Sequence, residues 1–90
     1  MAMWHVASYW APKLIINILK NHDTQTDVIY QVEWDSREGP RTVRLTLIKA
    51  TQEYDFEEGV PTAVVARALI KIRQWHASHG TYPDRTSWAS

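Results

Sequence analysis

Residues 28–34 read Val-Ile-Tyr-Gln-Val-Glu-Trp, and residues 42–47 read Thr-Val-Arg-Leu-Thr-Leu. In each stretch an apolar side chain stands at every second position, which is the period of a strand with one buried face. Between them, Gly39 tolerates a positive φ and Pro40 presets its own backbone angle, so residues 36–40 suit a turn. The two stretches are predicted to pair as an antiparallel hairpin with a shared apolar face.

The segment before the hairpin, residues 8–22, fits a helix best. Trp10, Leu14, Ile18 and His22 recur every four residues, which places them on one helical face. Ile16 is the one apolar residue off that face. The alternative is a strand, because Ile15, Ile16 and Ile18 are β-branched.

After the hairpin the chain shows two more periodic segments. Residues 51–59 alternate Tyr54 and Phe56 with acids, which favours a short third strand at the edge of the sheet. Residues 61–79 carry apolar side chains at helical spacing, begin at Pro61 and are followed by Gly80, which indicates a helix. Residues 81–90 have no period, and the chain is divided into one domain over residues 1–80 and a C-terminal tail over 81–90.

These elements predict a two-layer α+β domain in which an antiparallel sheet of two to four strands packs against helices, in the order α-β-β-(β)-α. If residues 8–22 are a strand instead, the fold becomes a β-meander followed by one C-terminal helix. The predicted core is the apolar face of the hairpin against both helices, made by Leu14, Ile18, Val28, Tyr30, Val32, Trp34, Val43, Leu45, Leu47, Leu69 and Ile72.

The predicted order resembles that of the double-stranded-RNA-binding domain. Pro12-Lys13-Leu14, Tyr30, Gly39-Pro40 and residues 63–72 stand in comparable places over about 60 residues. That family binds RNA through a lysine-rich start of its last helix. Here residues 62–66 read Thr-Ala-Val-Val-Ala, so no RNA-binding residue carries over.

Composition excludes several classes of function. The 90 residues hold 10 Lys+Arg and 10 Asp+Glu, so the formal net charge is zero, and a basic excess for gripping phosphates is missing. The absence of cysteine excludes a disulfide scaffold, a thiolate zinc site and a cysteine nucleophile. With three glycines and no Gly-x-Ser-x-Gly, neither a phosphate-binding loop nor a serine hydrolase is supported. We expect a non-enzymatic cytoplasmic protein without a cofactor and without a membrane span.

The zero net charge is a cancellation between two segments. Four acids and an aromatic ring form an acidic strip, which consists of Glu53, Tyr54, Asp55, Glu57 and Glu58. Residues 61–79 contain no acid, and a basic face is predicted from Arg67, Lys71 and Arg73 together with Arg41 and Arg44 of the hairpin. For both groups a solvated surface without a partner is the simpler alternative. His76 and His79, three residues apart, are weak candidates for metal ligands.

The sequence therefore predicts a protein-interaction module that regulates, links or inhibits a larger assembly, with the acidic strip or the basic face as the binding surface. Small accessory proteins of the phage type are often of this kind, and dimerisation is one way for such a module to act. Nucleic-acid binding by the basic face is the alternative function, and a histidine metal site is the third. No partner can be identified from the sequence.

Overall fold

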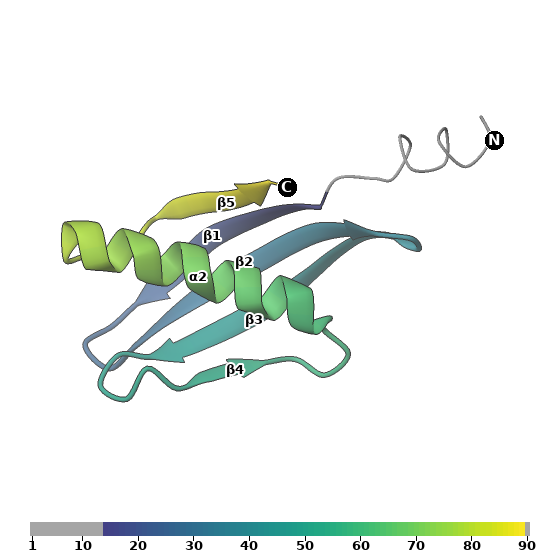
Figure 1. Cartoon of the computed structure of the whole chain (residues 1–90). Coiled ribbons are helices and arrows are strands. Elements are labelled where there is room, and N and C mark those ends of the chain that lie inside the picture. The colour runs from purple at the N-terminus through teal and green to yellow at the C-terminus, as the bar shows by residue number, and fades with distance from the viewer. Residues whose placement is uncertain (1–13, 90) are drawn as a thin grey trace.

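The computed structural model describes residues 14–89, which form a five-stranded antiparallel sheet with one helix across one of its faces (Figure 1). The elements are, in chain order, β1 (Ile15–Asp23), β2 (Asp27–Ser36), β3 (Gly39–Ile48), β4 (Tyr54–Phe56), α2 (Thr62–His79) and β5 (Arg85–Ala89). The strands lie side by side in the order β4-β3-β2-β1-β5.

The predicted α-β-β-(β)-α order is wrong, because the segment expected as the first helix contains β1. This strand pairs with β2 on one side and β5 on the other, and Ile16 and Ile18 are fully buried while Ile15 and Asn17 are exposed. The period is therefore two, as the β-branched residues of the strand alternative require. The likeness to the double-stranded-RNA-binding order also fails here, since it needs a helix in this place. Residues 8–13, on which part of the helical pattern rests, lie outside the described residues.

Residues 85–89, expected within a C-terminal tail, form β5 at one edge of the sheet. Trp88 pairs with Ile16 and Thr86 with Ile18, so both side chains lie on the helix-covered face. Thr86 and Trp88 are half-buried, while Arg85, Ser87 and Ala89 are exposed. The strand is too short for its alternation to stand out in the sequence.

Three local predictions are confirmed. β2 and β3 form the expected antiparallel hairpin with a shared apolar face, and its register places Tyr30 opposite Leu45 and Val32 opposite Val43. β4 is a short strand at the other edge of the sheet. The helix ends at His79, where Gly80 adopts a left-handed φ of 73° and its N–H donates to the His76 carbonyl at 2.8 Å.

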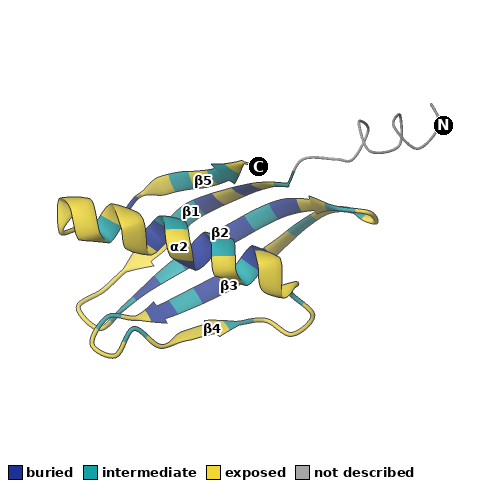
Figure 2. Ribbon diagram, in the orientation of Figure 1, coloured by how far each residue is buried: buried dark blue, intermediate teal, exposed yellow. Residues whose placement is uncertain are grey.

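The core lies between α2 and the face of the sheet that it crosses, as the band of buried positions in Figure 2 shows. Val64, Ala68, Leu69 and Ile72 of the helix pack there against alternate residues of β1, β2 and β3. Every predicted core residue is buried except Leu14, which is half-buried at the start of the described chain. The Tyr30 hydroxyl is also buried, and it donates a 2.8 Å hydrogen bond to the Pro83 carbonyl.

Candidate functional site

The second face of the sheet is not covered by any element of residues 14–89 (Figure 1). We call it the open face. Its central rows follow from the strand register, which places Asn17, Glu33 and Thr42 side by side, and Gln31 beside Arg44. The outward polar side chains include Asn17, His22, Asp27, Gln31, Glu33, Asp35, Thr42, Arg44, Thr46, Asp55, Glu57, Arg85 and Ser87. Ile15, Leu19, Ile29 and Ile48 are the large apolar side chains on this face, and Ile15 and Ile48 are exposed.

Four shallow hollows are lined by side chains of this face. One of about 250 Å³ lies between Asn17, Leu19, Glu33 and Arg85, across the strands at one side. Towards the other side, a hollow of about 260 Å³ is lined by residues that include Gln31, Arg44 and Glu57. Two more, of about 160 and 250 Å³, are lined by residues that include Asp35 and Asp55 respectively. Their small size and mixed polar and apolar lining suit contact with a protein surface better than enclosure of a small molecule.

The predicted acidic strip is divided by the alternation of β4. Asp55 pairs with Thr46 and belongs to the open face, as does Glu57, whose carboxylate accepts a 3.3 Å hydrogen bond from the Arg44 backbone N–H. Tyr54 lies on the opposite face, where it meets Phe56 edge to face at 6.3 Å and stays half exposed. Glu53 and Glu58 flank the strand and are exposed. The acids thus extend the open face at its edge.

The predicted basic face does not form one surface. Arg41 lies with its guanidinium 5.5 Å from the centre of the Trp34 ring, on the helix-covered side, whereas Arg44 points to the open face. On α2, Arg67 donates to the Ala63 carbonyl at 3.2 Å and lies 5.4 Å from the centre of the Trp88 ring. Arg73 donates to the Gln52 carbonyl at 3.0 Å, and Lys71 is half-buried.

The two histidines each stack on an aromatic ring. His76 lies 4.3 Å from the Tyr82 ring, and His79 lies 3.8 Å from the Trp75 ring in a nearly parallel stack. The described residues contain no group of three or more His, Cys, Asp or Glu side chains that could hold a metal ion. The geometry gives the proposed metal site no support.

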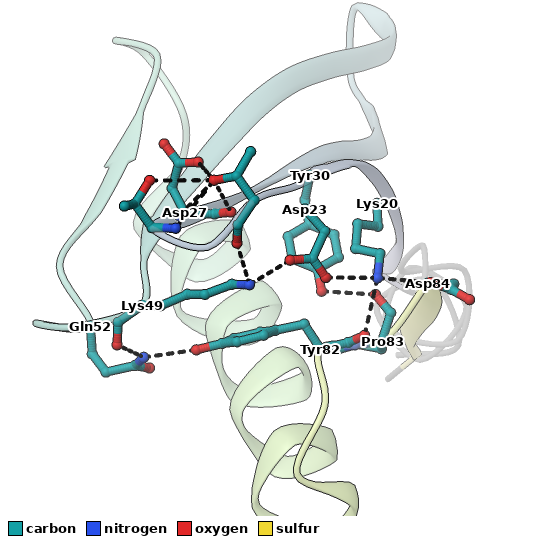
Figure 3. Close-up of polar contacts among 11 residues, drawn as sticks. Lys20, Asp23, Asp27, Tyr30, Lys49, Gln52, Tyr82, Pro83 and Asp84 are labelled. Carbon is teal, nitrogen blue, oxygen red and sulfur yellow. Dashed lines mark hydrogen bonds and ion pairs between the residues drawn. The ribbon is translucent and has the colours of Figure 1, made fainter.

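The sequence does not reveal a cluster of opposite charges at one end of the sheet, which we call the lysine–aspartate cluster (Figure 3). Lys20 lies 3.1 Å from Asp23 and 2.8 Å from Asp84, and Lys49 pairs with Asp23 from the other side. Its members come from three separate places in the chain, residues 20–23, Lys49 and Asp84, so no motif signals it. The cluster ties together the β1–β2 turn, the end of β3 and the loop before β5.

The cluster shifts the titration of its members. Hydrogen bonds from Lys49 and Lys20 hold the pKa of Asp23 below its ordinary value of 3.8. The bond to Asp84, followed by the one to Asp23, raises the pKa of Lys20 above 10.5. Burial raises the pKa of the nearby Tyr30 hydroxyl. Each charge of the cluster has an oppositely charged partner. Tyr82 packs against Lys49 and accepts a 2.9 Å hydrogen bond from Gln52. The cluster therefore has a structural role, and we do not propose it as a binding site.

Comparison of the chain with protein-family models, with curated proteins and with solved structures gave no match. Among residues 14–89, no helix is long and apolar enough to cross a membrane.

Proposed function

We propose that the chain is a non-enzymatic cytoplasmic interaction module that binds a basic protein surface with its open face and acidic edge, and so regulates, links or inhibits a larger assembly. The observation that carries the proposal is the unequal charge of this face. Asp27, Glu33, Asp35, Asp55 and Glu57 lie on it with only Arg44 and Arg85 of opposite sign, and no ion pair among the described residues involves any of them.

Electrostatic complementarity supports association more than stability, because unpaired surface acids attract a basic partner and disfavour an acidic one. The shallow hollows between these side chains offer room for the partner's lysine and arginine side chains. Binding by this face needs no rearrangement of the core, which lies on the other side of the sheet.

Protein is a better supported partner than nucleic acid for two reasons. Two cations of the predicted basic face, Arg67 and Arg73, already donate hydrogen bonds to the Ala63 and Gln52 carbonyls, and Arg44 lies on the other side of the sheet. The open face, as far as the described strands form it, also presents no Phe, Tyr or Trp ring on which an unpaired base could stack.

The test is capture of partners from a lysate of the native host with the wild-type chain and with a variant carrying Glu53→Lys, Asp55→Lys, Glu57→Gln and Glu58→Lys. Glutamine at position 57 keeps an oxygen for the Arg44 N–H. We expect a protein that is retained by the wild type and lost with the variant, while circular dichroism shows both to be folded.

A matched pair of single variants separates position from charge. Asp55→Lys and Glu38→Lys each replace one exposed acid by lysine, but Glu38 lies in the β2–β3 turn. The proposal requires that Asp55→Lys weakens retention of the captured protein and that Glu38→Lys does not. Equal retention by all variants would show that the acidic edge is ordinary solvated surface.

A further inference from the structure

The two sides of the molecule carry opposite charges. The open face has the five carboxylates named above and two arginines. On the other side, α2 carries Arg67, Lys71 and Arg73 without a single acid in residues 62–79, and Arg41 lies on the same side of the sheet. The zero net charge of the chain is therefore a separation of charge across the thickness of the fold.

These charges are not neutralised inside the molecule. Within residues 14–89 the ion pairs join only the lysines and aspartates of the lysine–aspartate cluster. Arg67 and Arg73 bond to carbonyl oxygens, which are uncharged, so the positive potential of the helix side remains. A protein with zero net charge also lacks the overall repulsion that keeps copies apart.

We propose that the open face of one copy binds the α2 side of a second copy, head to tail. The inference rests on the proposed function in that it assigns a partner to the same face. A symmetric dimer built on one of these two faces would bring either two acidic faces or two basic helices together, and like charges in contact are costly. A head-to-tail contact brings opposite charges together, and each copy keeps one unused face for the next.

Two consequences distinguish this contact from apolar association. It uses exposed charges, so it weakens when salt screens them: the Debye length falls from about 30 Å at about 10 mM salt to about 3 Å at about 1 M. It also occupies the surface that a basic partner protein would bind, so assembly of copies and binding of that partner exclude each other.

The experiment is sedimentation of nuclease-treated protein at low and high salt, with two charge-reversed variants. The first variant, Asp35→Lys with Asp55→Lys, changes two exposed acids of the open face. The second, Lys71→Glu with Arg73→Glu, changes the helix and spares Arg67, which packs against Trp88. Melting curves establish that each variant folds, and the salt dependence of the wild type needs no variant.

We expect the wild type to associate at low salt and to dissociate at high salt, and each variant alone to associate at least about tenfold more weakly. An equimolar mixture of the two variants should regain association, because the basic open face of one meets the acidic helix of the other. A chain that sediments as a monomer at low salt, variants that associate like the wild type, or a mixture that does not recover would each overturn the proposal.

Two further outcomes are separated by the same proteins. If a nucleic-acid oligonucleotide binds the wild type but not the helix variant and the chain itself stays monomeric, α2 serves nucleic acid and the head-to-tail contact is refuted. If the chain is monomeric but capture of a host protein still depends on the acidic edge, this inference fails and the proposed function stands.

Discussion

The two faces of the sheet are built from the same strands and have opposite physical roles. On the helix-covered face, Ile16, Tyr30 and Leu45 are fully buried beneath α2. On the open face their neighbours along the strands include the polar residues Asn17, Gln31 and Arg44, which stay accessible. Because side chains alternate, one residue step along a strand moves from a position that holds the fold to a position that is available for binding.

The two faces differ in how much they contribute to the stability of the fold. Burial of the helix-covered face supplies the folding free energy, so it tolerates little change in volume or polarity. The open face contributes few buried contacts, and its acids form no ion pair among the described residues. Substitutions on the helix-covered face should therefore change the free energy of unfolding more than substitutions on the open face.

The largest effect is expected from Leu45→Ala. This substitution removes a fully buried side chain between β2, β4 and the helix layer and leaves a cavity, so the free energy of unfolding should fall by about 2–5 kcal/mol. The neighbouring exposed Arg44→Ala is the control and should change it by less than about 1 kcal/mol. Urea unfolding measures both. Equal losses would contradict the division into two faces.

A smaller effect is expected from Tyr30→Phe. The ring stays in the core, but the buried hydroxyl and its hydrogen bond to the Pro83 carbonyl are removed, which should cost about 1–2 kcal/mol. Because Pro83 precedes β5, exchange of the β5 amide hydrogens should accelerate more than that of the β2–β3 hairpin. A variant whose exchange rises equally everywhere would show that this bond does not hold β5 in particular.

The hairpin and the C-terminal helix could be predicted from the sequence because their periods are set by residues that are close together in the chain. β1 could not be predicted in this way, because residues 14–19 have apolar side chains at both helical and strand spacings. Ile16 does not lie on the predicted helical face, yet it is fully buried in the strand. The one residue that did not fit the helix was therefore the one that indicated the strand. β5 has only Thr86 and Trp88 to mark it as a strand.

For the candidate site, the sequence predicted the acids at the edge of the sheet but not the surface to which they belong. Only the register places Asp55 beside Thr46, and Glu33 beside Thr42, on one face. Arg41 and Arg44 look like one basic group in the sequence, yet their odd separation along a strand sends them to opposite sides. The lysine–aspartate cluster joins three distant segments, which no local pattern encodes.

A pH-dependent effect is expected from the lysine–aspartate cluster, which belongs to neither face. Since the pKa of Asp23 is lower in the folded chain than its ordinary value of 3.8, its carboxylate stabilises the fold above that pH and loses this contribution as pH falls through the folded pKa. Asp23→Asn should therefore be less stable than the wild type at neutral pH, and the difference should shrink in acid. Thermal melts across this range measure it.

The matched control for this prediction is a double-mutant cycle with Lys49→Met. Of the two lysines that donate hydrogen bonds to the Asp23 carboxylate, Lys49 lowers its pKa more. Asp23→Asn should therefore lower the free energy of unfolding less in the Lys49→Met background than in the wild type. If the two substitutions add independently, or if the melting difference stays constant down to acid pH, the pairing does not contribute to stability.

The smallest effect on stability is expected from substitutions on the open face. A small effect there is needed to separate a loss of binding from a loss of folding. Asp55→Lys changes an exposed side chain on the edge strand and should alter the free energy of unfolding by less than about 0.5 kcal/mol, as should Glu38→Lys in the β2–β3 turn. If Asp55→Lys is silent in urea unfolding and yet reduces association while Glu38→Lys does not, the open face acts in binding alone. A loss of several kcal/mol would place Asp55 among the residues that hold the sheet together, and its effect on binding would then follow from unfolding.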